Sequence, residues 1–311
     1  MQTIINYPCN VKKENLGIRI KGFDFNTKEN KTLLLNPTKI DEIILTKQPS
    51  SISTGIFELN PNLTISIFNR GNPSHFIIPS KNLPKILKNE ELFFKLSKYK
   101  KRKLMWTFCK AVCSGRIKVL SRLNETRKNE NIKEILKEMR NLDRSLINAK
   151  TRQEIMGIEG NIAKNFYFAL SEMNREFAFE FERRDRRSID VINVLMNFMH
   201  TVLRNKIQQR LILNGINPYH SFLHENHRGQ PSLTFDFAEF WIAYIDKLIF
   251  YSLERGIVKK EDIKNGRLKR ASIEKCINLI NLRIKNEEID FKIKEFMGFL
   301  KGKNKFSWKP N

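Results

Sequence analysis

Long apolar runs are missing from this 311-residue sequence, and we expect no secretory leader. A helix needs roughly 18–20 mainly apolar residues to span a bilayer, and no stretch reaches that length. The first residues, MQTIINYPCNVKK, lack the basic region followed by an apolar stretch that is typical of a signal peptide. We therefore expect no membrane association and a cytoplasmic location.

Cysteine is also scarce, and its spacing argues against a disulfide framework or a zinc site. The four cysteines form no CxxC pair, and we expect buried, reduced thiols. They are Cys9, Cys109, Cys113 and Cys276. The sequence also has no glycine-rich loop ending in Lys-Ser/Thr, so nucleotide hydrolysis is not expected.

Acidic residues are few relative to basic ones. The sequence has 57 Lys and Arg against 33 Asp and Glu, a formal net charge of +24. Such a surplus indicates a polyanionic partner, either nucleic acid or an acidic membrane surface. The membrane surface is the weaker alternative, because no helix clearly pairs a basic face with an exposed aromatic face.

Half of the surplus charge lies between Lys95 and Lys150, where 17 basic and 5 acidic residues give +12. Apolar residues at helical spacing run through this stretch, so it predicts a packed helix with one basic side. A basic side of this kind would bind phosphates regardless of base sequence. The candidate phosphate-binding residues are Lys100, Lys101, Arg102 and Lys103, a second group of Arg183, Arg184, Arg186 and Arg187, and Arg228.

The order of the predicted elements indicates an α+β protein of two domains. Short period-two runs separated by turn residues predict a small β-sandwich-like domain over residues 1–82, with one short helix that Ser50 or Ser51 could cap. Residues 83–92 are expected to form a hinge, and 301–311 a basic tail whose composition is compatible with disorder. Between them we expect an all-α catalytic domain, residues 93–300. Its predicted helices are Phe93–Arg127, Asn131–Asn148, Thr151–Glu182, Ser188–Asn214, Leu233–Arg255 and Ala271–Leu300.

One stretch, residues 217–246, carries a candidate cation site. Asp236 and Glu239 are three residues apart, so on a helix both carboxylates lie on one face. They lie among aromatic residues, where a carboxylate without a counter-charge is poorly solvated. His224 precedes them and could complete the site. It does not belong to a zinc-protease motif, because His224 and His227 are three residues apart and the motif needs four.

A further carboxylate, Glu159, lies upstream between Gly157 and Gly160 in an otherwise apolar helical pattern. Glycine costs roughly 1 kcal/mol relative to alanine inside a helix. Two glycines here are best explained by the close approach of a backbone or a ligand. Taken alone, Glu159 is a weak signal, because a carboxylate on a helix is usually exposed.

Several segments, taken together, resemble the CRISPR-associated endonuclease family, the integrase of CRISPR adaptation. They are GIEGNIAKNFY (157–167), the region of Asp190 and Asn193, GINPYHSFLHENHRGQPSLTFDFAEFW (215–241), and the N-terminal stretch 35–73. In that family three residues hold a metal ion, and they match Glu159, His224 and Glu239. Asp236 matches an acidic residue close to the same catalytic centre. The family usually has Tyr where this chain has Phe166, with Tyr167 adjacent.

The resemblance implies a metal-dependent DNA endonuclease and integrase that inserts short foreign DNA into a CRISPR array. A 3′-hydroxyl would attack a phosphodiester at the repeat in a transesterification. The donor set suits Mg²⁺ or Mn²⁺. The implied partners are double-stranded DNA, a second copy of the chain in a homodimer, and a small CRISPR-associated adaptation protein. A branched-DNA repair nuclease with the same site and a non-catalytic nucleic-acid-binding protein remain as alternatives.

Overall fold

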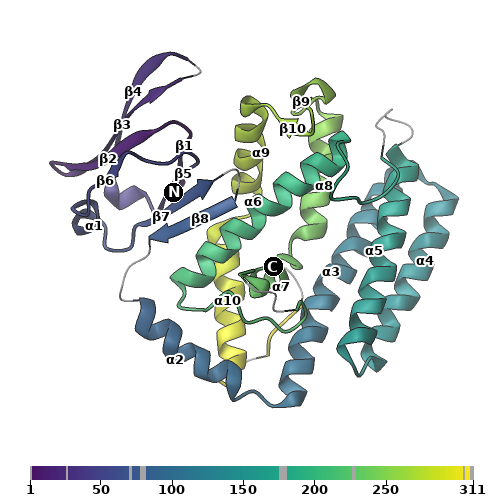
Figure 1. Cartoon of the computed structure of the whole chain (residues 1–311). Helices are drawn as coiled ribbons and strands as arrows, with labels where there is room; N and C mark the ends of the chain where they lie inside the picture. The colour runs from purple at the N-terminus through teal and green to yellow at the C-terminus, as the bar shows by residue number, and fades with distance from the viewer. Residues whose placement is uncertain are drawn as a thin grey trace. The chain divides into compact units, whose positions relative to one another are not determined.

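A computed structural model describes residues 2–25, 27–69, 72–77, 82–174, 181–225, 229–303 and 305–308. The chain is mixed α+β, and a strand-rich N-terminal part precedes a larger helical part, as predicted (Figure 1). It divides into two compact units, Met1–Leu87 and Lys88–Asn311.

The N-terminal unit contains two four-stranded sheets. The first has the order β1 (Gln2–Ile5), β5 (Glu42–Leu45), β7 (Thr64–Asn69), β8 (Asn72–Ile77). The second has the order β4 (Glu29–Leu35), β3 (Gly17–Asp24), β2 (Cys9–Glu14), β6 (Ser51–Ile52). Alternate residues of β3, such as Ile18 and Ile20, are buried in a core to which both sheets contribute. Strands β1, β5 and β7 pair in parallel, a feature that the strand pattern did not predict.

The short helix of this unit forms, but without the predicted serine cap. Helix α1 covers Ile56–Leu59, and Gly55 occupies its N-cap without a side-chain hydrogen bond. Ser51 instead pairs with β2 as part of strand β6. The short helix was therefore predicted correctly, but the residue at its N-cap was not.

The segment expected as a hinge, 83–92, is helical. Helix α2 runs from Asn82 to Phe94, and the division between the two units falls inside it. Pro84 lies in the first turn of α2, where proline removes no helical hydrogen bond.

The C-terminal unit is built from helices, with one small hairpin that the sequence did not predict. Its helices are α3 (Lys98–Arg127), α4 (Glu130–Ser145), α5 (Arg152–Asn174), α6 (Val191–Leu213), α7 (Ser232–Ala238), α8 (Ile242–Glu254), α9 (Arg270–Arg283) and α10 (Asn286–Leu300). The hairpin joins β9 (Ile263–Lys264) to β10 (Arg267–Leu268). Helix α3 packs against α4, α5 and α8, and α6 packs against α7 to α10 (Figure 1).

Two predicted helices differ in extent from those observed. The predicted helix 151–182 is helical only to Asn174; residues 175–180 lie outside the described part of the chain, and Phe181 and Glu182 are not helical. The predicted helix 233–255 is two helices, because the chain bends between Ala238 and Ile242. The bend follows from packing, since Phe240 and Trp241 are adjacent in sequence and both are buried.

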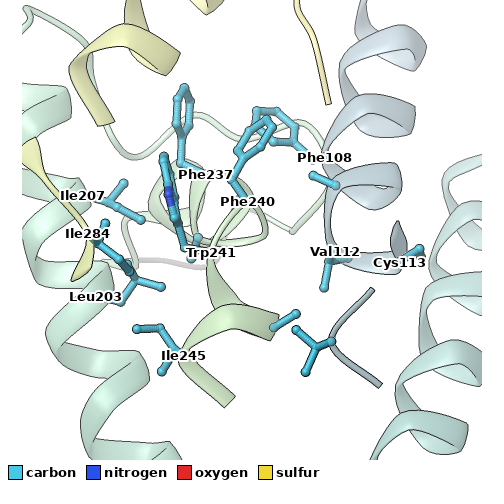
Figure 2. Packing of buried hydrophobic residues seen from close by; sticks show 14 of the residues in the cluster. Phe108, Val112, Cys113, Leu203, Ile207, Phe237, Phe240, Trp241, Ile245 and Ile284 are labelled. Atoms are coloured by element: carbon cyan, nitrogen blue, oxygen red, sulfur yellow. The ribbon is translucent and has the colours of Figure 1, made fainter. Parts of the chain in front are cut away.

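Aromatic side chains fill the centre of the helical unit. Phe237, Phe240 and Trp241 lie between side chains of α3 and α6 (Figure 2). The ring of Phe306 lies 5.5 Å from the ring of Phe108 and is only 5% exposed. The tail 301–311, whose composition was compatible with disorder, therefore packs into the core at Phe306. None of the described helices is long and apolar enough to span a bilayer.

Candidate functional site

Asp236 fixes the loop that carries His224. Its fully buried carboxylate accepts hydrogen bonds from the backbone N–H groups of Phe222 (2.7 Å), Leu223 (3.1 Å) and His224 (3.0 Å). It also lies 2.8 Å from Nδ1 of His224. The carboxylate of Asp236 therefore faces four donors, so one side chain sets both the backbone and the ring orientation of the loop.

The other ring nitrogen of His224 faces Glu239, which caps the C-terminal end of α7. Nε2 of His224 and Oε1 of Glu239 are 3.6 Å apart, too far for a direct hydrogen bond. Oε2 of Glu239 is buried and has no hydrogen-bond partner among the described residues. A buried polar atom without a partner is costly, so the pair is suited to a ligand that both groups could bind.

Burial and neighbouring charges together set the protonation of His224 and Glu239. Burial raises the pKa of Glu239 to about 7; His224 and Arg116 oppose that rise, whereas the charges of Glu159 and Asp236 add to it. For His224, burial lowers the pKa, but the hydrogen bond to Asp236 and the charges of Glu239, Asp236 and Glu159 outweigh it, and the pKa is raised. Glu159, His224 and Glu239 thus lie within one another's electrostatic field, although about 65 residues separate the first two.

Glu159, on α5, forms an ion pair with Arg116, on α3. Arg116 is buried, and burial alone would lower its pKa, but the charges of Glu159, Tyr167 and Glu239 and the hydrogen bond to Glu159 together outweigh this and raise it. The guanidinium of Arg116 also lies over the ring of Tyr167, 5.8 Å from its centroid. Arg116 was not predicted as a site residue, although it is the one charged residue on the buried face formed by Val112, Cys113 and Leu120.

The donors fit Mg²⁺ or Mn²⁺ in their chemistry, because these hard ions favour carboxylate oxygens and accept one imidazole. The unpartnered oxygen of Glu239 and the oriented Nε2 of His224 support this fit. Within the described part of the chain, however, no three His, Cys, Asp or Glu side chains form a ready metal-binding group. Glu159 is engaged by Arg116 and would have to turn toward the other two donors.

A second polar cluster lies beside the site, and the sequence did not reveal it. His200 on α6 is buried, and its Nε2 lies 2.7 Å from Oδ1 of Asp246 on α8. The hydroxyl of Tyr167 donates to the other oxygen of Asp246 at 3.3 Å. Phe166, in the position where the related family usually has Tyr, is fully buried in the core. Tyr167 therefore brings a hydroxyl near Arg116, whereas Phe166 serves packing.

The two predicted basic groups differ in their environments. Lys101 and Arg102 are exposed at the start of α3, whereas the ammonium group of Lys103 lies over the ring of Phe299 at 5.8 Å. Arg183, Arg186 and Arg187 are exposed, and Lys100 and Arg184 are half-buried. Arg228 lies outside the described residues. Nε2 of His220 lies 2.6 Å from Oε1 of Glu90 on α2.

Solved structures share this architecture. A casposase bound to an integration product superposes with a TM-score of 0.79 at 21% identity, covering 99% of this chain and 92% of that one. A CAS1 protein from Thermotoga maritima gives 0.74 at 17% identity and 99% coverage of both chains. A chain of a Cas6-RT-Cas1–Cas2 complex gives 0.76 at 14% identity, covering all of this chain and 36% of that one. At these identities the likeness shows the fold.

The class follows from sequence as well as fold: this is a CRISPR-associated protein. The family model described as "CRISPR associated protein Cas1" matches residues 5–281, so the chain belongs to the Cas1 family. Cas1 3 of Methanobrevibacter ruminantium is 30% identical over 153 residues, 45% of each chain. The Cas1 1 endonuclease of Chlorobaculum tepidum is 35% identical over 123 residues, 38% of this chain and 36% of the relative. The matched segments thus span less than half the length of these relatives.

Proposed function

We propose that the chain is a metal-dependent DNA endonuclease and integrase of CRISPR adaptation, which inserts short foreign DNA into a repeat array. Membership of the Cas1 family and the likeness to a casposase bound to an integration product support this function. Curated relatives are named as endonucleases, which is consistent with the same chemistry. We further propose that this activity is cytoplasmic.

One observation carries the proposal. Asp236 holds Nδ1 of His224, which leaves Nε2 directed at Glu239, and a buried oxygen of Glu239 has no partner among the described residues. This arrangement resembles a metal-binding histidine whose second nitrogen is oriented by a carboxylate. We propose Glu159, His224 and Glu239 as the ligands and Asp236 as the residue that positions His224.

A divalent ion bound there would neutralise charge that develops on the phosphate oxygens. The reaction exchanges one phosphodiester for another: a 3′-hydroxyl oxygen forms a new bond to phosphorus, and the displaced strand leaves with its own 3′-hydroxyl. No external energy source is needed, because one P–O bond forms as another breaks. A proton and a metal ion would compete for Glu239 near neutral pH, because burial raises its pKa to about 7.

Double-stranded DNA is the proposed substrate, and the net charge of +24 supports a polyanionic partner. We also propose a homodimer and a small CRISPR-associated adaptation protein as partners. The second partner is suggested by the solved complex that contains both Cas1 and Cas2 and shares this fold. The N-terminal strand-rich unit, residues 1–82, is proposed as the dimerisation domain and residues 93–300 as the catalytic domain.

The proposal can be tested by strand transfer of labelled DNA into a repeat-bearing plasmid in Mn²⁺. We expect Glu159→Ala, His224→Ala and Glu239→Ala to abolish joining while DNA retention stays largely intact. Full joining by any of these variants would exclude the proposed ligand set. Cleavage of branched DNA without integration would favour the repair nuclease instead, and binding without any metal-dependent reaction would favour a non-catalytic protein.

A further inference from the structure

A line of polar residues follows one face of α6 and ends beside the candidate metal site. Asn193, Asn197, Thr201 and Arg204 are spaced by four, four and three residues, so they lie above one another on the helix surface. They are linked by hydrogen bonds: the Thr201 hydroxyl donates to the carbonyl oxygen of Asn197 at 2.7 Å, and Nη2 of Arg204 donates to that hydroxyl at 3.2 Å. The chain of contacts therefore extends over three turns.

The first half of this line holds the arginine-rich segment that precedes α6. Arg184 donates to Oδ1 of Asn193 at 2.9 Å and to Oδ1 of Asn197 at 2.6 Å. The amide nitrogen of Asn197 donates to the carbonyl of Arg186 at 2.9 Å, and that of Asn193 donates to the carbonyl of Arg183 at 2.9 Å. Neutral amides therefore fix the positions of the arginines without neutralising their charge.

The second half of the line reaches the site. The guanidinium of Arg204 lies 4.7 Å from the centroid of the Phe235 ring, at the start of α7. The same ring lies 5.8 Å from the imidazole of His224. Arg204 and His224 therefore share one aromatic neighbour, and Phe235 is adjacent in sequence to Asp236, which orients His224.

Acidic residues compensate the charge of Arg204 only weakly. Burial, the largest effect, and repulsion from Arg186 and Arg184 together lower the pKa of Arg204 to about 10, and the charge of Glu239 opposes them. Arg184, in contrast, also lies in the field of Asp246 and Asp190. Within the described part of the chain, Arg204 makes no salt bridge within 4 Å. Cations that repel one another destabilise the fold, and a bound anion would relieve that repulsion.

We propose that Arg204, together with Arg184 and Arg186, forms a phosphate-binding site for the DNA strand that enters the catalytic centre. The inference rests on the proposed function and deepens it. It assigns to these arginines the binding of the backbone phosphates next to the reacting phosphodiester. In this site the guanidinium of Arg204 donates to a phosphate oxygen. The Phe235 ring, over which the guanidinium lies, orients it. Asn193 and Asn197 are positioning residues, because they act by holding Arg184 and the backbone of the arginine-rich segment.

The direct test is the affinity of the full chain for a fluorescently labelled DNA duplex, measured in EDTA over a range of salt concentrations. Arg204→Gln keeps most of the side chain and removes the charge. We expect roughly tenfold weaker binding, because a charge-assisted hydrogen bond to phosphate is lost. The slope of log affinity against log salt should fall by about one. Arg283→Gln, an exposed arginine of α9, is the matched control and should change neither quantity appreciably.

A second variant separates this role from simple structural support. Asn197→Asp keeps the oxygen that accepts from Arg184 and adds a negative charge to the cluster, but it loses the amide donor to the carbonyl of Arg186. We expect this variant to bind DNA less tightly, because the added charge repels phosphate. Its melting temperature should stay close to that of the wild type, because the relieved repulsion among the arginines offsets the lost hydrogen bond. A residue needed only for folding would instead lower both quantities when it is changed.

The inference is overturned if Arg204→Gln binds DNA like the wild type, or if it and Arg283→Gln weaken binding equally. It is also overturned if folded Asn197→Asp binds DNA with unchanged affinity. Binding in EDTA requires no strand transfer, so these results stand whether or not the chain is an integrase. If the wild-type chain binds DNA through these arginines but shows no strand transfer, the proposed function is rejected and the proposed phosphate-binding site still stands.

Discussion

Arg116 of α3 and Glu159 of α5 form a largely buried ion pair, with side chains only 7% and 16% exposed. Glu159 is also the upstream carboxylate proposed to bind metal. A cation of the protein thus already occupies one oxygen of this carboxylate, and a divalent metal ion would have to compete with Arg116 for it. In the structure, Arg116 compensates the buried charge of Glu159.

Replacement of Arg116 should therefore be costly. We expect Arg116→Met to lower the free energy of unfolding by about 3 kcal/mol, because Glu159 is left without its counter-charge in a poorly solvated place. Urea denaturation measures this change. Arg122→Met, an exposed arginine of the same helix, should shift stability by no more than about 0.5 kcal/mol. Equal stabilities of the two variants would show that the pair contributes little.

Asp236 and Glu239 should respond differently to neutral replacement. Asp236→Asn loses the charge that orients His224, and we expect strand transfer to fall roughly 10- to 100-fold. Glu239→Gln removes a proposed ligand and should abolish the reaction. Initial rates with labelled DNA at saturating Mn²⁺ measure both. Complete loss of activity in Asp236→Asn would place Asp236 among the ligands.

Gly157 and Gly160 offer a test of the surface around Glu159. Apart from chain neighbours and the backbone of α5 itself, an added Cβ at either position would meet no atom of the described residues within 4 Å, so packing among these residues does not require the glycines. We expect Gly157→Ala and Gly160→Ala each to stabilise the chain, by up to about 1 kcal/mol. If DNA approaches α5 closely, the same variants should lose strand-transfer activity. A gain in stability with full activity would show that no ligand needs this surface.

His200 should make the helical unit sensitive to acid. Burial lowers the pKa of His200 and outweighs the opposing effect of Asp246, so the buried ring is neutral. The unfolded chain then takes up a proton that the folded chain does not, and the stability contribution is complete above the unfolded pKa of about 6.5. It is lost as pH falls below that value, at about 1.4 kcal/mol per unit of pKa difference.

This acid sensitivity can be measured by urea unfolding at pH 7.5 and 5.5. The wild type should lose more stability between the two pH values than His200→Gln, which keeps a neutral donor for Asp246 but does not titrate. Parallel losses in the two proteins would assign the acid sensitivity to other groups.

The packing of Phe306 predicts that the C-terminal segment matters for stability. We expect Phe306→Ala to cost about 3 kcal/mol, because it empties a space between Phe108, Phe237 and Phe296. Phe168→Ala is the control, since Phe168 is 53% exposed and should cost little. Thermal unfolding of both variants checks the difference.

The succession of a strand-rich part and a helical part was predictable, because apolar residues recur with a period near two in the first part and near 3.6 in the second. The boundaries of single elements were not. The break between α7 and α8 lies where Phe240 and Trp241 are both buried, and tertiary packing of this kind leaves no local pattern. The burial of Phe306 depends on a cluster whose other rings come from α3, α7 and α10, and no local pattern reveals it.

The sequence predicted Glu159, His224, Asp236 and Glu239 as site residues through residue type, spacing and family resemblance. It could not show that backbone N–H groups occupy the oxygens of Asp236, because every residue type except proline carries such a donor. Nor could it pair Arg116 with Glu159, which is 43 residues away and on another helix. Only the folded chain brings such partners together.

The hydrogen bonds from three consecutive backbone N–H groups to Asp236 have a consequence for how related proteins can diverge. His224 and Asp236 are 12 residues apart in sequence, yet their distance is set by one carboxylate and not by the length of chain between them. We expect related chains to tolerate insertions and deletions between these two residues while the imidazole stays in register with Glu239. Without Asp236, every change in the length of this loop would instead alter the position of His224 relative to Glu239.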